Sequence, residues 1–545
     1  MFSGTSKTNF TICNLKLNGN RDNITGGEIT SLKFNGFYLE TCTDFLIENV
    51  TFDDMRSDDV RCVTNCTRGT IRQCTGINTS VNQNYDHIAL TGCSYMTVDD
   101  CYFTKKSCGV YVGPGSDYNI IQNNRIYSTN DGEHIYVYQS SYNLIESNIC
   151  IGKQTHAGEC ISINSADNVV RGNYVDPQGM SAGIGAGTDG GEFATGTVIS
   201  NNRVMNAENE GISISQINCT ISGNVVTLSS RWGIYTSAAG TTVSGNVVSS
   251  SGAANIRLQT GSDGSTVIGN HVTLAGDAGG IQVLSNYNTV TGNTAYANAG
   301  AGIAGGGNNN IVSANTCVDN NESGIYFPSG NYNQIIDNTS TRAAASQNYG
   351  ILFNSGTGNT ISGNVVFNNG NDNIRTAGGV TLTTINDNDV RGTGNKITLN
   401  GAIANVYDNK GYIAPGEIRT ISGSITGLTP AGIMTGGSID NPFGQAVRVL
   451  SVDIEVTTQG AASGSMCVGI GSSATTDYAT IFSVLPSDPG TTYPYFYNST
   501  KTATYGVQTN PINWATGGGN RYLNFYAHVA NAAFVATYTI TVMGN

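Results

Sequence analysis

The sequence predicts an all-β protein in which a long parallel β-solenoid is followed by an antiparallel β-sandwich. Three observations predict this class. Gly supplies 70 of the 545 residues and only 12% are charged, which disfavours helical proteins and coiled coils, since these are rich in Ala, Glu, Lys and Leu. A short phrase centred on Asn recurs as far as residue 409. Beyond Pro415 the phrase stops and longer runs of strand-forming residues follow.

The recurring phrase is an apolar residue, two variable residues, Asn and a second apolar segment, as in Thr242–Val248. Successive marks of the phrase are 21 to 29 residues apart. A repeat of this length with short strands and no helical periodicity is typical of a β-solenoid, in which one repeat forms one turn. Asn at a fixed turn position can stack into a hydrogen-bonded ladder. The marks are Asn49, Cys74, Cys101, Asn124, Asn148, Asn173, Asn202, Asn224, Asn246, Asn270, Asn293, Asn315, Asn338, Asn364, Asn388 and Asn409.

A second phrase precedes the Asn mark by about ten residues and consists of Gly-Ile or a relative, as in Gly109–Val112 and Gly233–Thr236. Its residues alternate in character, so that one set points into the coil and the other set points outward. We therefore expect residues 1–414 to form the solenoid, with each strand paired in parallel to the equivalent strand of the next turn.

The C-terminal part, residues 415–545, has a different sequence pattern. Strand-like runs such as Val447–Val456 and Phe534–Val542 are separated by loops that contain Pro and Gly. Long runs of this kind predict an antiparallel β-sandwich.

The formal net charge is −13, which disfavours nucleic acid and anionic membranes as partners. No apolar run reaches the length of about 18 residues that a membrane span needs, and no secretory signal opens the chain. We expect synthesis in the cytoplasm without a signal peptide; the alternative is a secreted protein whose N-terminus lies outside this sequence. The 13 cysteines lack the spacing of a zinc site, and we expect reduced interior thiols.

Four acids precede the Gly-Ile type strand at equivalent positions: Asp86, Glu133, Glu159 and Glu210. Counting turns places Glu133 and Glu159 in adjacent turns, about 5 Å apart, and Asp86 two turns from Glu133, about 10 Å apart. Retaining glycosidases separate their two carboxyl groups by about 5 to 5.5 Å and inverting ones by about 6.5 to 9.5 Å. We therefore expect Glu133 and Glu159 to be the catalytic pair, with Asp86 as the alternate partner and His134 as the tuning group.

Aromatic residues follow the same strands at outward positions. Such a row beside carboxylates suits a glycan groove, because rings stack on sugar faces; the alternative is a solvated face on which Tyr only covers strands. The residues that we expect to contact substrate are Tyr111, Tyr136, Tyr138, Tyr235, Arg257, Glu210, His87 and His156.

We expect no metal ion and no cofactor. The acidic pairs Asp53–Asp54, Asp58–Asp59 and Asp99–Asp100 are interpreted as loop charges, and the alternative is a Ca²⁺ site.

The rung motif, already complete at Phe10–Leu15, resembles the right-handed parallel β-helix superfamily of pectate lyases, polygalacturonases, alginate epimerases and phage tailspikes, over residues 9–414. The resemblance implies a virion tailspike-like depolymerase that hydrolyses a bacterial or archaeal surface polysaccharide as a homotrimer. One enzymatic alternative is a polysaccharide lyase or uronate C5-epimerase that uses Tyr85, Asp86, His87, His134 and Tyr136. Another alternative is a non-catalytic glycan-binding adhesin. A β-helix normally has a cap on its first turn, so we also expect a segment to precede residue 1.

Overall fold

A computed structural model of the protein divides into two compact units, Met1–Asn359 and Thr360–Asn545. In the first unit it describes residues 2–19, 35–77, 85–104, 106–127, 132–152, 158–187, 195–343 and 347–359. In the second unit it describes residues 360–393, 395–402, 404–413, 418–426, 432–440, 447–458, 466–471, 480–484, 492–493, 512–514, 522–527 and 535–544. Across these ranges no helix is long and apolar enough to cross a membrane.

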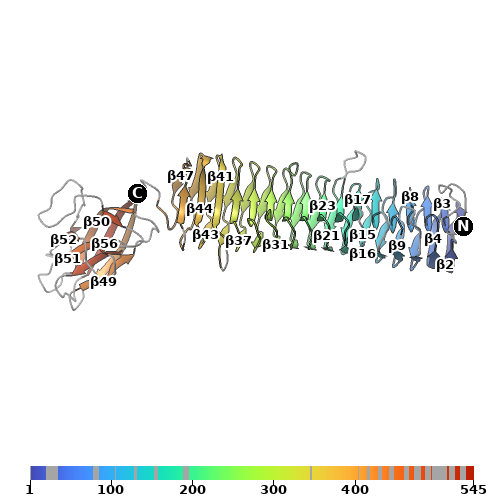
Figure 1. Ribbon diagram of the computed structural model, residues 1–545, viewed down its shortest axis with the longest axis horizontal. Helices are drawn as coiled ribbons and strands as arrows, with labels where there is room; N and C mark the ends of the chain where they lie inside the picture. Colours follow the sequence, from blue (N-terminus) through green and yellow to red (C-terminus); the bar gives the residue numbers. More distant parts are fainter. Residues whose placement is uncertain are drawn as a thin grey trace. The chain divides into compact units, whose positions relative to one another are not determined.

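The first unit is a parallel coil whose strands follow one another in sequence order along its length (Figure 1). Each typical turn contributes one strand to a first sheet and two short strands to a second sheet. The strands of the first sheet in this unit are β1 (Phe2–Thr5), β3 (Phe37–Glu40), β5 (Val60–Val63), β8 (Ile88–Thr91), β11 (Val110–Val112), β14 (Ile135–Tyr138), β17 (Glu159–Asn164), β20 (Ala182–Ala186), β23 (Glu210–Ile214), β26 (Trp232–Thr236), β29 (Ala254–Leu258), β32 (Gly279–Val283), β35 (Ile303–Gly305), β38 (Ser323–Phe327) and β41 (Tyr349–Thr357).

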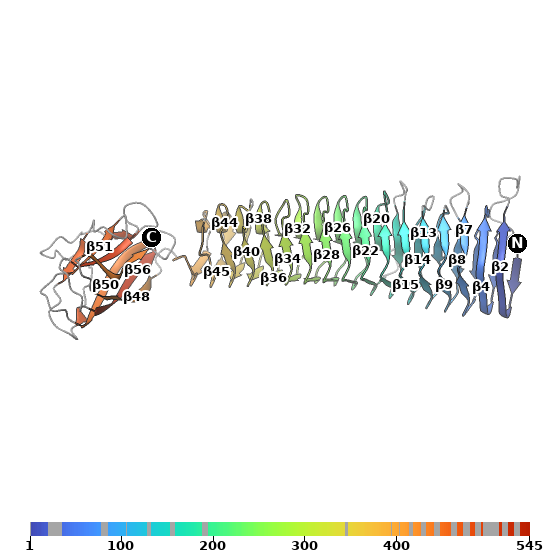
Figure 2. The same cartoon turned by 90° about the horizontal axis from the view of Figure 1, so that it is seen from below.

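The second sheet of this unit begins with two long strands and continues with two short strands in each turn, as the turned view in Figure 2 also shows. Its strands are β2 (Thr8–Asn18), β4 (Thr43–Asp53), β6 (Thr70–Arg72), β7 (Thr75–Ile77), β9 (Thr97–Asp99), β10 (Tyr102–Thr104), β12 (Ile120–Gln122), β13 (Arg125–Tyr127), β15 (Leu144–Glu146), β16 (Ile149–Ile151), β18 (Val169–Arg171), β19 (Tyr174–Asp176), β21 (Val198–Ser200), β22 (Arg203–Met205), β24 (Thr220–Ser222), β25 (Val225–Thr227), β27 (Thr242–Ser244), β28 (Val247–Ser249), β30 (Thr266–Ile268), β31 (His271–Thr273), β33 (Thr289–Thr291), β34 (Thr294–Tyr296), β36 (Ile311–Ser313), β37 (Thr316–Val318), β39 (Gln334–Ile336) and β40 (Thr339–Thr341).

The core consists of files of apolar side chains, where a file is the set of equivalent positions in successive turns of the coil. In the first sheet, Ile88 pairs with Val110, Val110 with Ile135 and Ile135 with Ile161, and all four side chains are fully buried. Burying one such side chain stabilises the fold by about 1.5 to 3 kcal/mol. Alternate residues of each strand therefore point inward, as the sequence predicts, and the intervening residues form the outer face.

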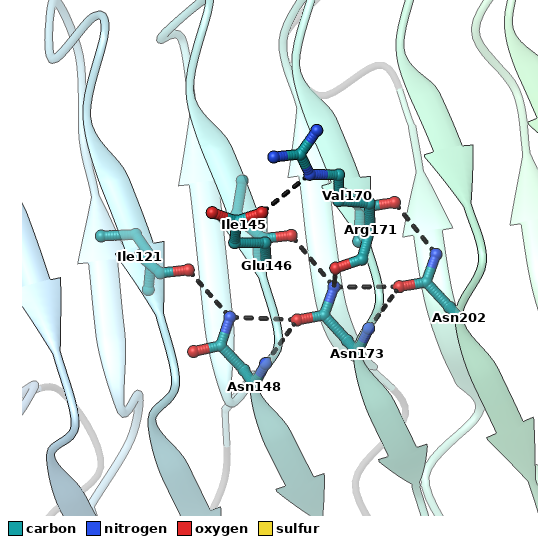
Figure 3. A network of polar contacts seen from close by, with 8 residues as sticks. All are labelled: Ile121, Ile145, Glu146, Asn148, Val170, Arg171, Asn173 and Asn202. Carbon is teal, nitrogen blue, oxygen red and sulfur yellow. Dashed lines mark hydrogen bonds and ion pairs between the residues drawn. The ribbon is translucent and has the colours of Figure 1, made fainter.

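The predicted asparagine ladder is present (Figure 3). The Asn173 amide donates to Oδ1 of Asn202 at 2.9 Å and to the carbonyl of Ile145 at 3.0 Å. Its own Oδ1 accepts from the backbone N–H of Asn148 at 2.9 Å. The same pattern links each mark to the next from Asn124 to Asn338. Each turn thus satisfies polar backbone groups of its neighbours inside the coil.

One mark is corrected by the structure. Thr51 pairs with Thr75, which places Val50 and not Asn49 beside Cys74. Asn49 is exposed, has a left-handed backbone (φ 53°) and donates to Asn14 at 2.7 Å on the outer surface. The prediction for Asn49 is wrong because β4 runs unbroken through this position, so the Asn there belongs to an outer stack.

A second inner ladder was not predicted. The backbone N–H of Asn119 donates to Asn143 Oδ1 at 2.9 Å, and that of Asn143 donates to Asn168 Oδ1 at 2.9 Å. This second ladder continues through Thr197 beside Asn168. After turns that carry Ser, Thr or Cys at this position, Asn returns at Asn288. Because Asn is absent from these turns, the sequence shows no residue that recurs at this position in every repeat.

The second unit contains further coil strands and an antiparallel part. The coil strands are β42 (Thr360–Ser362), β43 (Val365–Phe367), β44 (Asp372–Thr381), β45 (Thr383–Asn386), β46 (Asn395–Leu399) and β47 (Ala404–Tyr407). The antiparallel strands are β48 (Ile418–Thr426), β49 (Gly432–Asp440), β50 (Val447–Thr458), β51 (Met466–Gly471), β52 (Thr480–Val484), β53 (Thr492–Tyr493), β54 (Ile512–Trp514), β55 (Tyr522–Ala527) and β56 (Val535–Gly544). Strand β49 pairs with β48 at Thr435 and with β55 on both sides of a register shift, so two antiparallel groups of strands share it. The predicted fold class, a parallel β-helix followed by an antiparallel β-sandwich, is confirmed.

Candidate functional site

The predicted acids share one file of the first sheet. Strand pairing gives the file the order Asp58, Asp86, Cys108, Glu133, Glu159, Ala182, Glu210 and Trp232, one residue per turn. Glu133 and Glu159 therefore lie in adjacent turns, as predicted, and Glu159 and Glu210 lie two turns apart. Asp58, interpreted from the sequence as a loop charge, extends the file by one carboxylate.

Glu133 and Glu159 are both partly exposed. Strands rise by about 4.8 Å per turn, so the two carboxyl groups start from backbones at this separation. Oε2 of Glu133 lies 3.8 Å from the thiol sulfur of Cys108. The Glu159 side chain bends over Gly185 of the next turn, where an added Cβ would lie 2.4 Å from Cγ of Glu159. Only Gly leaves the Glu159 carboxylate room to reach the outer face at this point.

The outward row runs beside the acids and has a gap. Tyr111 and Tyr136 are register neighbours, with ring centroids 5.6 Å apart, and Tyr138 lies 5.8 Å from Tyr136. Small residues occupy the next three turns, and the row then resumes with Tyr235 and Arg257. The small residues are Ser162, Gly185 and Ser213. The gap lies next to Glu159 and Glu210, and two of its residues, Ser162 and Gly185, are buried, so small residues and not rings adjoin these two carboxylates.

Trp232 follows Glu210 in the acid file and was missed by the sequence analysis. Its ring stacks on Tyr235 with centroids 4.7 Å apart. The guanidinium carbons of Arg231 and Arg257 lie 3.7 Å and 4.8 Å from the centroid of the Trp232 ring. Trp232 is one of only two Trp residues in the chain, and this rarity was the feature of the sequence that could have indicated it.

Two of the predicted site histidines do not lie on the outer face. His87 and His134 point into the coil and are fully buried. The His87 ring stacks on Phe103, and Nδ1 of His134 lies 3.2 Å from the Cys160 sulfur. Burial lowers the pKa of His134 to about 4. This placement does not fit the predicted roles of His87 in sugar binding and of His134 beside the catalytic acids. His156 lies outside the described residues.

His87 belongs to a buried ionic network. Its Nδ1 lies 2.5 Å from Oδ2 of Asp59, and Lys106 pairs with the other oxygen of Asp59. An added Cβ on Gly76 would meet His87 Nδ1 at 2.1 Å, so this Gly makes the space that the network fills. Lys106 also donates to the backbone carbonyl of Asp86 at 3.3 Å, which ties the network to the first acid of the file.

Asp86 has a strongly perturbed carboxyl group. Burial, followed by the charge of the neighbouring Asp58, raises the pKa of Asp86 to about 8. Burial also raises the pKa of Asp58, although Arg61 donates to its Oδ2 at 3.0 Å. Further along, burial raises the pKa of Glu210, which the nearby Arg231 opposes. An acid that stays protonated near neutral pH can donate a proton to a leaving group.

The titration of Asp86 predicts a pH-dependent stability. The pKa of about 8 in the fold exceeds the value of 3.8 expected without the fold, so the folded protein holds a proton that the unfolded chain has lost. The contribution of Asp86 to stability is therefore fully present below about pH 4 and falls by at most about 1.4 kcal/mol per pH unit as the pH rises to 8. Asp86→Asn should flatten this slope and raise the unfolding midpoint at pH 8, measured by urea denaturation between pH 4 and 9. The exposed Asp277→Asn is the control, and an unchanged slope in Asp86→Asn would contradict the assignment.

The acids considered for Ca²⁺ have protein partners. Asp58 pairs with Arg61, Asp59 pairs with His87 and Lys106, and Asp53 pairs with Lys16 at 3.2 Å. Within the described ranges, no group of three or more His, Cys, Asp or Glu could hold a metal ion. Twelve described cysteines have free thiols, and all but Cys13 are buried.

Comparison with solved structures finds similarity to phage tailspike proteins. A mutant tailspike protein of E. coli bacteriophage HK620 in complex with a hexasaccharide is 13% identical, with 99% of this chain and 86% of that chain covered and a TM-score of 0.40. The Dettilon tailspike protein is 13% identical, with 83% of this chain and 88% of that chain covered and a TM-score of 0.33. No curated protein matches the chain.

A family model described as a right-handed beta helix region matches residues 35–193 and 270–414. These two segments make up more than half of the chain and contain the acid file from Asp58 to Ala182 and the outward row as far as Gly185, whereas Glu210 and Trp232 lie between them. The chain therefore belongs to the right-handed β-helix family.

Proposed function

We propose that this protein binds and hydrolyses a cell-surface polysaccharide on the outer face of its first sheet. The observation that carries the proposal is the register of Glu133 and Glu159, which lie in adjacent turns beside a row of outward aromatic rings. Two carboxyl groups are what glycoside hydrolysis requires, one to protonate the glycosidic oxygen and one to act as base or nucleophile. The aromatic row supplies flat apolar surfaces for sugar rings.

The separation of one turn favours a retaining reaction, in which the second carboxylate attacks the sugar. In this assignment Glu159, which reaches over Gly185 toward the gap in the row, acts as the nucleophile, and Glu133 acts as the acid/base. Asp86 is the alternate acid, because its pKa of about 8 keeps it protonated near neutral pH. Pairing Asp86 with Glu133, two turns away, would favour inversion instead.

The lyase or epimerase alternative has less support from the described residues. It needs imidazole or phenolate groups at the surface, whereas His87 and His134 are buried. Burial, followed by the charge of Asp86, raises the pKa of Tyr111 to about 12, which makes its phenolate scarce at neutral pH. The row of Tyr and acids is equally compatible with a glycan-binding adhesin, which the experiment below separates from an enzyme.

We further propose that the protein is a component of a virion tail and a homotrimer, with residues 1–414 as the glycan-binding coil and residues 415–545 as a trimerisation or carbohydrate-binding module. Neither a cofactor, a nucleic acid nor a membrane enters this proposal.

The test is incubation with surface polysaccharides purified from candidate bacterial and archaeal hosts, followed by size-exclusion chromatography. Hydrolysis shortens the chains and releases one reducing end per cut without new absorbance near 235 nm, whereas a lyase adds that absorbance. Retention of a polysaccharide without shortening would establish the adhesin instead of the enzyme. A right-angle light-scattering mass equal to that of one chain would contradict the homotrimer.

A further inference from the structure

Two arginine side chains converge on the Trp232 ring, next to the acid file. Arg231 is exposed and Arg257 is partly exposed, and their guanidinium carbons lie 3.7 Å and 4.8 Å from the ring centroid. Each contact is a cation–π interaction with the best of the aromatic acceptors. The convergence of two positive charges on one ring is unusual for a chain with a net charge of −13.

Arg257 is held in place by neutral groups. Its Nε donates to Oε1 of Gln259 at 2.8 Å, and its Nη1 donates to Oε1 of Gln282 at 2.7 Å. These amides fix the orientation of the guanidinium group but leave its charge uncompensated. Burial, and then the charge of Arg231, lowers the pKa of Arg257, opposed by Tyr235, so the two cations are close enough to repel each other.

Several other arginines of the described coil have a carboxylate partner, although Arg125 and Arg203 have none among the described residues. Arg61, Arg68, Arg72, Arg171 and Arg391 pair with Asp58, Asp44, Glu48, Glu146 and Asp389 respectively. Within the described residues, neither Arg231 nor Arg257 lies within ion-pair distance of a carboxylate. The nearest acid in register is Glu210, which adjoins Trp232 in the file. Burial raises the pKa of Glu210, and the charge of Arg231 opposes this rise without a direct ion pair. Within the described coil, this pair is distinguished by two guanidinium groups without a carboxylate partner that lie over one Trp ring.

We propose, on the basis of the glycan-binding function argued above, that Arg231 and Arg257 together bind an anionic group of the polysaccharide, so that the substrate is an acidic glycan. A carboxylate, phosphate or sulfate has several acceptor oxygens, and planar guanidinium groups bind such oxygens in pairs. An anion between the two arginines would remove their mutual repulsion. The sugar that carries it would lie by Trp232 and Tyr235, three turns along the coil from Glu159.

The experiment uses Trp232 as the reporter. In the full chain with Trp514→Phe, Trp232 is the one remaining Trp, and its emission is titrated with glucose, glucuronate, glucose 6-phosphate and glucose 6-sulfate. We expect a saturable change with at least one acidic sugar and none with glucose at the same concentration. The three acidic sugars distinguish a carboxylate, a phosphate and a sulfate as the group that is bound. The affinity should fall as salt is added, because the contact is ionic.

The matched variants are Arg231→Gln and Arg257→Gln, with the exposed Arg203→Gln of β22 as the control. Each of the first two should weaken binding of the acidic sugar by at least about tenfold, the control should not, and Arg257→Lys should retain part of the affinity. Unchanged circular dichroism shows that the variants are folded.

The inference is overturned if no acidic sugar changes the emission, if glucose acts equally, or if the two Gln variants bind normally. These outcomes differ from failure of the proposed hydrolysis. Binding of an acidic sugar through both arginines without cleavage of any polysaccharide retains this inference and removes hydrolysis. Cleavage of a neutral polysaccharide that neither Gln variant affects retains hydrolysis and removes this inference.

Discussion

Glu159→Gln is expected to abolish shortening of the polysaccharide while leaving its binding intact. The amide keeps the shape of the side chain that bends over Gly185 but can neither attack a sugar carbon nor accept a proton. Glu133→Gln, one turn away in register, should have the same effect because the amide cannot protonate the leaving group. Loss of either group should lower kcat by at least about 10²- to 10⁴-fold, measured as new reducing ends per minute.

The control is Glu208→Gln, an exposed acid two residues before Glu210, which should cleave normally. Gly185→Ala offers an independent test, because the new methyl group would lie 2.4 Å from Glu159 Cγ and must displace the carboxylate. We expect it to reduce kcat strongly without changing the chemistry of either acid. Full activity in both Glu133→Gln and Glu159→Gln would refute the assignment, and loss of activity only in Asp86→Asn and Glu133→Gln would point to the inverting pair.

Asn173→Ala is expected to destabilise the coil strongly. The side-chain amide donates hydrogen bonds to Oδ1 of Asn202 and to the backbone carbonyls of Ile145 and Arg171. Its Oδ1 accepts two hydrogen bonds from Asn148, one from the backbone N–H and one from the side-chain amide. Asn173 is only 1% exposed, so water cannot replace these partners. Each buried polar group left unsatisfied costs about 1 to 3 kcal/mol, and several are lost together, as Figure 3 makes plain.

The measurement is urea unfolding combined with hydrogen exchange of the turns on either side of Asn173. We expect a loss of several kcal/mol, on the scale of about 1 to 3 kcal/mol per orphaned group, and faster exchange in β16, β19 and β22. Asn173→Asp should be at least as harmful, because a carboxylate cannot donate to Asn202 Oδ1. The exposed Asn348→Ala is the control. A change of less than about 0.5 kcal/mol in Asn173→Ala, the range of ordinary surface substitutions, would contradict a stabilising role for the ladder.

Much of the coil follows directly from local pattern. The alternation around Ile88, Val110 and Ile135 specifies which side chains point inward, and the spacing of the Asn marks specifies the length of a turn. Asn49 shows where this reasoning fails, because an Asn that itself has the left-handed backbone, one position before the inner file, looks the same in the sequence as a ladder residue. The second ladder escaped detection since Thr197 and Ser265 replace Asn in its middle turns while keeping the backbone geometry.

The candidate site, like the coil, was predictable from the sequence only in part. The sequence by itself determined that Asp86, Glu133, Glu159 and Glu210 share one file, because period and register are properties of a repeat. Only the tertiary structure decided that His87 and His134 are buried, that Glu159 bends over Gly185, and that two arginines meet on Trp232. Register specifies a residue's turn and file, whereas burial and side-chain contact depend on the size of the neighbours one turn away, and these neighbours are 20 to 30 residues distant in the sequence.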